Sequence, residues 1–419
     1  MTSISAELGR GVLGAADLRK RLGVSPPTLM RAVQEAGAAV VAIGRGRATR
    51  YALRQTWSMQ GTSRFPVVRI SQDGAPRPEG ELLTLAAGQT VWMPAGDVRD
   101  GLPVELADAR PAGFLGRHFA TTHADLRLPA RLTDWSDHHI LLAVSRRGED
   151  LPGNLVVGDE SFERWQRLAP SPVTRGDYPA LVEATIAGHP PGSSAGGERP
   201  KFGALVDGRH VLVKFAARGD AVATRWCDLL VLEALAHDVL SSHGVPAART
   251  TIVETGSHRF LESERFDRSG PRGRTGVVSL AAVQEDPSDS WARSAVILQH
   301  GNHLSREDGR RLQWLDAFGA MIANTDRHPH NVLFFTERAD ARLRLAPSFD
   351  QVPMLYAPTA DGRVAQQAFG TPLATADTLE VWADARLVAR EYWLRAGNDD
   401  RLSEDARAFS NQNANALVD

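Results

Sequence analysis

The chain has 419 residues, which is long enough for two or three domains with ample core. Its 48 basic and 50 acidic side chains give a net charge of −2, which excludes a molecule that is cationic throughout. Its single cysteine, Cys227, excludes a disulfide framework and a cysteine zinc cluster and fits a reducing compartment. No apolar run approaches the length of a membrane span and no signal pattern is present, so we expect a soluble, cytoplasmic protein without a membrane partner.

The first 54 residues differ from the rest in charge and predict a winged helix-turn-helix. They contain nine basic and three acidic residues, a charge of +6, against −8 for the remainder. Helices are expected at 15–22 and from Pro26 to Gly37, followed by a hairpin of strands 40–43 and 49–53.

In this fold the second helix enters the major groove of double-stranded DNA and the wing contacts the backbone or minor groove. The side chains expected toward DNA are Ser25, Thr28, Arg31, Arg45, Arg47 and Arg50. The alternative is a small helical protein-interaction domain with a solvated basic face.

Residues 55–62 have the composition of a linker, and residues 63–268 predict a β-rich lobe. Strands are expected at 65–70, 82–85, 91–93 and 155–157, with a helix at 135–146. Nothing in this part indicates chemistry until residue 190.

The segment 190–201 is rich in glycine and serine and ends at a lysine. Small residues let backbone N–H groups approach phosphates closely. The predicted nucleotide contacts are Gly196, Gly197 and Lys201. A plain linker is the alternative, because such composition is common in linkers.

Lys214 is a charge within the apolar run 211–215, the second strand of a hairpin that turns at Asp207-Gly208. A strand lysine near the phosphates is how kinase folds hold the nucleotide. A helix over 221–241 follows, and its Glu233 is the expected partner, with Asp228 as an alternative. An edge-strand lysine that discourages aggregation is the competing interpretation.

The stretch 324–350 carries the strongest chemical pattern. Asp326 and Asn331 lie five residues apart in a loop before an apolar strand at 332–335, and Asp350 ends the next short strand. One carboxylate would orient an attacking hydroxyl, while Asn331 and Asp350 would hold Mg²⁺ on nucleotide phosphates, with His328 supporting the loop. Because Asn and Asp are also common turn residues, the spacing alone is weak.

Five motifs follow one another along the chain: D-L-P-G-N at 150–154, S-S-A-G-G-x-x-x-K at 193–201, E-R-F-D-R at 264–268, N-T-D-R-H-x-x-N at 324–331 and A-P-x-x-D at 346–350. Taken together, in this order and over roughly residues 60 to 400, the chain resembles the HipA-like serine/threonine kinases of bacterial toxin–antitoxin systems, especially the longer members with their own N-terminal DNA-binding domain. After the metal aspartate, however, Gln351 stands where apolar residues are expected in relatives.

The resemblance implies an α+β, kinase-like fold with two lobes and ATP·Mg²⁺ between them, the helical lobe spanning 269–419. It implies an adenine-binding hinge at Glu264 and Phe266, and autophosphorylation at Ser193 or Ser194. The family precedent for a protein substrate is an aminoacyl-tRNA synthetase, and a separate antitoxin partner stays open.

From the residues and the resemblance together we expect transfer of the γ-phosphoryl group of ATP to a serine or threonine. Two alternatives remain: a DNA-binding regulator with an inactive or nucleotide-sensing kinase-like body, and a small-molecule kinase.

Overall fold

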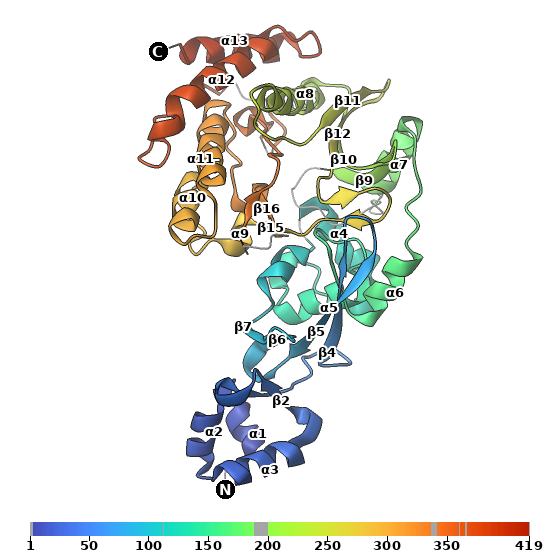
Figure 1. The fold of residues 1–419 in the computed structure, drawn as a ribbon. Coiled ribbons are helices and arrows are strands. Elements are labelled where there is room, and N and C mark those ends of the chain that lie inside the picture. The colour runs from blue at the N-terminus through green and yellow to red at the C-terminus, as the bar shows by residue number, and fades with distance from the viewer. Residues whose placement is uncertain are drawn as a thin grey trace.

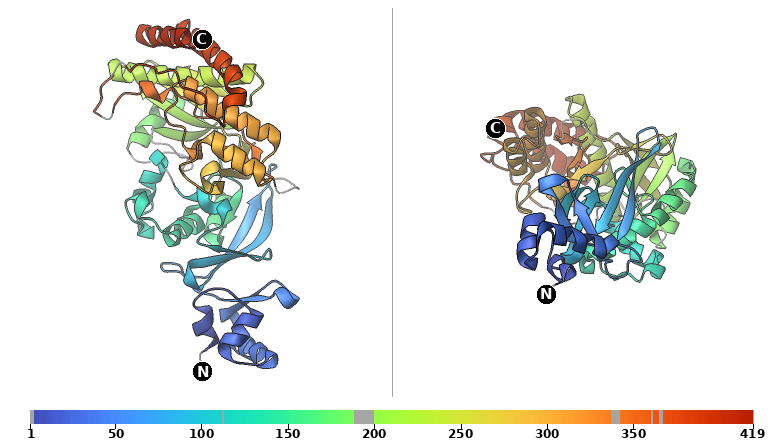
Figure 2. Two further views of the ribbon diagram at one scale, coloured as in Figure 1. Left: turned by 90° about the vertical axis from the view of Figure 1, so that its left-hand side faces the viewer. Right: turned by 60° about the horizontal axis from the view of Figure 1, so that its bottom comes forward.

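The computed structural model describes residues 3–418 apart from 112, 188–199, 337–341, 360 and 365–366. The protein is elongated, with the N-terminal unit at one end and the C-terminal helices at the other (Figures 1 and 2). Four units with sheets or cores of their own follow one another along the chain.

The N-terminal unit is three helices and a small antiparallel sheet of order β1-β3-β2. Its core joins Leu8, Leu18, Leu29, Val40 and Tyr51. The first short helix was not predicted; the others begin and end where expected, because Gly23 takes a left-handed φ of 67° and ends the second helix. The elements are α1 (Ile4–Leu8), β1 (Leu13–Gly14), α2 (Ala15–Leu22), α3 (Pro26–Ala36), β2 (Val40–Ile43) and β3 (Arg50–Leu53).

The middle domain is a five-stranded antiparallel sheet of order β7-β6-β5-β4-β8 with helices packed against it. Its strand β5 begins at Pro76, well before the strand expected at 82–85. Both Pro76 and Pro78 are tolerated because β6 pairs only with residues 81–84, so the first half of β5 is an edge. The elements are β4 (Arg64–Ile70), β5 (Pro76–Thr84), β6 (Gln89–Met93), β7 (Asp97–Asp100), α4 (Gly113–Thr122), α5 (Asp137–Arg147), β8 (Leu155–Val157) and α6 (Asp159–Arg167).

The segment 55–62, expected to be a linker, is anchored in this domain. Trp57 is buried, stacks on His138 with ring centroids 4.6 Å apart, and donates its indole N–H to the carbonyl of Leu85. The wing also packs on the middle sheet, since Ile43 and Ala52 share a core with Leu83, Leu85 and Val91. The N-terminal unit is therefore docked against the middle domain.

A second sheet, of order β11-β12-β10-β9, carries the strand lysine and packs against α8. The range 63–268, expected as one β-rich lobe, thus holds two sheets with separate cores. The elements are α7 (Tyr178–Ile186), β9 (Lys201–Val206), β10 (Arg209–Ala217), α8 (Ala221–Ser242), β11 (Thr250–Glu254) and β12 (His258–Glu264).

The C-terminal lobe is mostly helical and holds the largest core of the molecule, built on α8, α10, α11 and α12. A three-stranded sheet of order β15-β16-β17 supports the loops of the 324–350 stretch. The elements are β13 (Arg268–Ser269), β14 (Gly273–Arg274), β15 (Val277–Ser279), α9 (Leu280–Val283), α10 (Trp291–His300), α11 (Arg306–Met321), β16 (Leu333–Phe335), β17 (Arg344–Leu345), α12 (Leu379–Gly397) and α13 (Glu404–Ala416).

Candidate active site

Lys214 reaches the interior because β10 alternates its faces. Val211, Val213 and Phe215 enter the core shared with Tyr178 and Phe260, while the intervening side chains point to the other face, against α8. There the Nζ of Lys214 donates to both carboxylate oxygens of Glu233, at 2.7 and 2.8 Å. Asp228, the alternative partner, instead accepts from the backbone and hydroxyl of Ser403 at the start of α13.

The lysine has a second carboxylate partner in Asp350, which comes from the far side of the site. Asp350 has a φ of 57°, a left-handed backbone that non-glycine residues rarely adopt. Burial alone would raise the pKa of Asp350, but the charges of Lys214 and Lys201 outweigh that influence and hold the pKa at about 2. Asp350 is therefore ionised throughout the physiological pH range.

Lys201 lies opposite Lys214 in the register of β9 and β10 and is 2% exposed. Both lysines line a cavity of about 110 Å³ together with Glu233, Asp326 and Asp350. The structure thus brings five of the predicted site residues to one place. The other predicted residues of the glycine- and serine-rich segment (Ser193, Ser194, Gly196 and Gly197) lie outside the described residues.

Asp326 lies in the loop that follows α11, and local hydrogen bonds set the shape of that loop. Its backbone N–H donates to the side-chain oxygen of Asn324 at 3.0 Å, and its carbonyl accepts from the N–H of His328 at 2.9 Å. The side-chain amide of Asn331 donates to the same carbonyl at 3.0 Å. These bonds use the backbone of Asp326, and its carboxylate, which lines the cavity, has no hydrogen-bond partner in the part of the chain that the structure describes.

Two opposed shifts in pKa mark this loop. Burial raises the pKa of Asp326, and the neighbouring His328 opposes that rise. Burial also lowers the pKa of His328, against the attraction of Asp326. His328 is held through its carbonyl, which accepts from the indole of Trp291 at 3.2 Å. Asp326, a carboxylate with an elevated pKa in the same cavity as Lys201 and Lys214, is suited to accept a proton from a hydroxyl group.

The donor chemistry of Asn331 and Asp350 would suit a magnesium ion. Asn331 donates through its amide nitrogen, so its amide oxygen is the atom that would face a metal, and Asp350 is an ionised carboxylate. Magnesium uses oxygen donors and takes few of them from the protein when phosphates and water complete its shell. Among the described residues, no group of three or more His, Cys, Asp or Glu side chains is arranged to hold a metal ion.

The predicted hinge segment 264–268 contains a buried ionic cluster that sequence reasoning did not anticipate. Asp267 accepts from Arg265 at 2.9 and 2.7 Å and from Arg268 at 2.7 Å. Arg268 also donates to the carbonyls of Leu151 and Gly153, in the D-L-P-G turn. The D-L-P-G-N and E-R-F-D-R motifs therefore bond to each other and join the middle domain to the predicted hinge segment. This set of contacts is called the clamp below.

Of the two hinge residues, Phe266 packs its ring against Phe335 and Phe349, each with centroids 5.9 Å away, directly beside Asp350. The backbone N–H of Glu264 already donates to the carbonyl of Arg249 at 2.8 Å. An adenine contact by Glu264 is thus restricted to its carbonyl oxygen.

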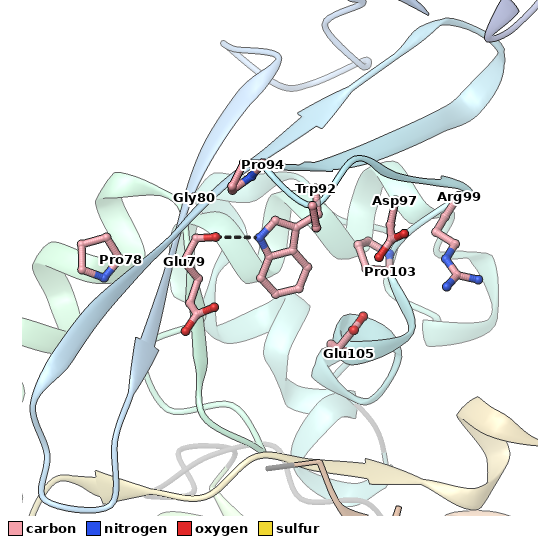
Figure 3. Close-up of a pocket in the computed structure, with 10 residues that line it drawn as sticks. Pro78, Glu79, Gly80, Trp92, Pro94, Asp97, Arg99, Pro103 and Glu105 are labelled. Carbon is pink, nitrogen blue, oxygen red and sulfur yellow. Dashed lines mark hydrogen bonds between the residues drawn. The ribbon is translucent and has the colours of Figure 1, made fainter. Parts of the chain in front are cut away.

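A larger cavity, of about 630 Å³, lies on the middle domain, away from these groups. Its wall is the indole of Trp92, whose N–H donates to the carbonyl of Glu79, with Asp97, Arg99 and Glu105 around it (Figure 3). Size alone does not mark the site of chemistry here, because the smaller cavity brings together Asp326, whose pKa is raised, and Asp350, whose pKa is lowered.

The predicted DNA-facing side chains are exposed, but they differ in their contacts. Ser25 and Thr28 bond to each other through their hydroxyl groups at 2.9 Å, so Ser25 precedes α3 without capping its backbone. Arg50 donates to the carbonyl of Gly96 at 2.8 Å, which joins the wing to the middle domain. The remaining three are Arg31, on α3, and Arg45 and Arg47, on the wing.

Within the described part of the chain, no helix combines the length and apolarity that crossing a membrane requires.

Comparison with known proteins identifies the family. Family models match the YjjJ-like toxin middle domain over residues 61–166 and the HipA-like C-terminal domain over residues 193–412. Toxin YjjJ of Escherichia coli (strain K12) is 33% identical over 437 residues, covering 98% of this chain and 96% of the relative. A chain from the Shewanella oneidensis MR-1 complex of HipA, HipB and operator DNA matches with a TM-score of 0.54 and 14% identity, over 84% of this chain and 96% of that one.

The fold prediction is confirmed by these matches: the architecture is α+β and kinase-like. The chain belongs to the HipA-like toxin family, as a YjjJ-like member.

Proposed function

We propose that the protein is an ATP-dependent protein kinase that phosphorylates a serine or threonine of a protein target. The observation that carries the proposal is the convergence of Lys214, Glu233, Asp326 and Asp350 on one cavity from four separate segments. Structural ion pairs also bury lysines, but they do not need an additional carboxylate such as Asp326, whose pKa is raised by burial and whose side chain has no hydrogen-bond partner among the described residues.

Each residue has a role that follows from its contacts. Lys214, oriented by Glu233, and Lys201 bind the phosphates of ATP through their positive charge. Asn331 and Asp350 would hold Mg²⁺, which supplies charge neutralisation on the phosphates. The carbonyl of Glu264 and the backbone of Phe266 are the proposed contacts for adenine.

In the transfer step, the acceptor hydroxyl oxygen forms a bond to the γ-phosphorus while the bond from that phosphorus to the β–γ bridging oxygen breaks. ADP leaves with the bond's electron pair, and the hydroxyl proton passes to the carboxylate of Asp326. Catalysis in this class is mostly positioning and charge stabilisation. The bonds that orient Asp326 and Lys214 are therefore as important as the two groups themselves.

The N-terminal unit is proposed to bind double-stranded DNA and to serve autoregulation. Its excess of six positive charges and the exposed Arg31, Arg45 and Arg47 support this role. The solved HipA chain occurs in a complex with HipB and operator DNA. For this chain, an antitoxin partner and autophosphorylation at Ser193 or Ser194 are proposed from family membership.

The proposal is tested by incubating the purified protein with Mg²⁺ and γ-labelled ATP, alone and with a bacterial lysate. We expect phosphoserine or phosphothreonine on the protein and on at least one lysate protein. Asp326→Asn should abolish both signals without unfolding the chain, whereas Asp159→Asn, at an exposed site on the middle domain, should leave them unchanged. Wild-type protein that transfers no label would refute the kinase assignment and favour a DNA-binding regulator.

A further inference from the structure

Gln351, which follows Asp350, is a polar residue in a fully buried position, with 0% of its surface exposed. Its side-chain oxygen accepts from the amide of Asn324 at 3.3 Å, and its side-chain nitrogen donates to the hydroxyl of Ser348 at 3.2 Å. A primary amide can accept and donate in these two directions at once, which no apolar side chain can do. Both ends of this buried amide are hydrogen-bonded, so the two segments that it connects show what the residue does.

On one side Gln351 reaches the loop of Asp326. Asn324, its partner, uses its own side-chain oxygen to accept from the backbone N–H of Asp326 at 3.0 Å. Asn324 is itself 1% exposed, so no solvent molecule competes freely for these bonds. An unbroken chain of hydrogen bonds therefore leads from Gln351 to the backbone of the proposed proton acceptor.

On the other side Gln351 closes a turn around Asp350. The bond from Gln351 to Ser348 spans three residues and encloses the left-handed backbone of Asp350. Ser348 is in turn fixed, because its N–H donates to the carbonyl of Pro246 and its carbonyl accepts from Ala248. A disfavoured backbone conformation persists only where its surroundings hold it, and here the amide of Gln351 is part of that support.

We propose that Gln351 is a positioning residue that fixes the Asp326 loop and the Asp350 loop relative to each other. The inference rests on the proposed phosphoryl transfer, because it assigns these two carboxylates to the hydroxyl and the metal. Gln351 touches neither the nucleotide nor the acceptor in this assignment. It acts through Asn324 and Ser348, and its amide occupies a place where an apolar side chain would leave both partners without a bond.

The test compares Gln351→Met, which keeps the length of the side chain and removes both bonds, with Gln60→Met. Gln60 is a matched control, because it is also buried and bonds through one amide to the carbonyl of His138. We expect Gln351→Met to lower kcat on the order of a hundredfold, as a displacement of about 1 Å can do. Gln60→Met should leave kcat unchanged.

Two further readouts separate positioning from a general loss of structure. First, calorimetry should show weaker binding of ATP with Mg²⁺ and unchanged binding of ATP without metal, since the displaced group is a metal ligand. Second, the effects of Gln351→Met and Asn324→Ala on log kcat should not add, because both act on Asp326 through the same bonds. Additive effects, or a kcat within twofold of wild type, would overturn the inference.

If Gln351→Met does not fold, Ser348→Ala removes only the partner hydroxyl and is judged by the same kcat and metal-dependence criteria. Wild-type protein without any phosphoryl transfer would instead refute the proposed function, so the two failures are distinguishable.

Discussion

Replacing Lys214 by methionine is expected to destabilise the fold and to abolish activity, for two separable reasons. The ammonium group is buried and bridges Glu233 and Asp350, so its loss leaves two neighbouring carboxylates without their cation. Removing one partner of a buried pair costs about 3–5 kcal/mol. Burial already raises the pKa of Glu233 above its ordinary value, and in the variant that pKa would rise further.

A second substitution separates charge balance from chemistry. Lys214→Met/Glu233→Leu also removes one of the two stranded carboxylates, while Asp350 keeps the nearby charge of Lys201. We therefore expect part of the lost free energy of unfolding to return while phosphoryl transfer stays absent. Urea denaturation monitored by tryptophan fluorescence gives the free energy of unfolding for both variants. Lys20→Met, at an exposed position on α2, is the matched control and should stay within about 0.5 kcal/mol of wild type.

The sign of the pH dependence provides an independent check. In Lys214→Met a Glu233 carboxyl with a raised folded-state pKa binds more protons in the folded state than in the unfolded state. The contribution of this carboxyl group to the free energy of unfolding should therefore be largest at low pH and be lost as pH rises through the folded-state pKa of Glu233. The reasoning would be refuted if the single variant were as stable as wild type, or if the double variant were no more stable than the single one.

Three other perturbations give separate tests. His237 is buried on α8 with no partner for either ring nitrogen among the described residues, and burial lowers its pKa to about 3. Because the unfolded chain takes up this proton first, the free energy of unfolding should fall below pH 6.5, by about 2 kcal/mol at pH 5. His237→Leu should remove that loss in denaturation experiments at pH 7 and pH 5, whereas an identical pH dependence in the variant would contradict the assignment. Arg45→Ala/Arg47→Ala should weaken binding to duplex DNA in fluorescence anisotropy. The slope of log affinity against log salt concentration should fall in magnitude by about two, and an unchanged slope would exclude the wing from the interface. Asp267→Asn removes the carboxylate that Arg265 and Arg268 share, although Arg268 keeps its bond to Asp150, and should lower the free energy of unfolding by about 3 kcal/mol in urea denaturation. A stability equal to that of wild type would mean that this ionic cluster does not hold the predicted hinge segment.

The parts of the site that could be predicted are those with a local signal. A lysine inside an apolar strand, one acid on the buried face of the next helix, and Asp326 and Asn331 five residues apart before a strand are all visible in the chain. The apolar run 211–215 and the helix expected over 221–241 likewise correspond to β10 and α8. In these cases the local pattern and the tertiary contacts agree.

The parts that could not be predicted depend on contacts between distant segments. Gln351 and Asn324 are 27 residues apart, and the clamp joins Asp267 to Gly153 across 114 positions. Trp57 similarly turned an expected linker into part of a core, because its ring stacks on His138, 81 positions further along the chain. No periodicity or short motif encodes such pairs, since each half alone has the composition of a turn or loop.

The most direct measurement of the central claim is a crystal structure of the protein with Mg²⁺ and a non-hydrolysable ATP analogue. The account predicts a metal within about 2.1 Å of oxygen atoms of Asn331 and Asp350, with Lys214 on the phosphates and the Asp326 carboxylate facing the γ-phosphorus. Nucleotide bound in the larger cavity beside Trp92, or a metal that leaves Asp350 unligated, would contradict it.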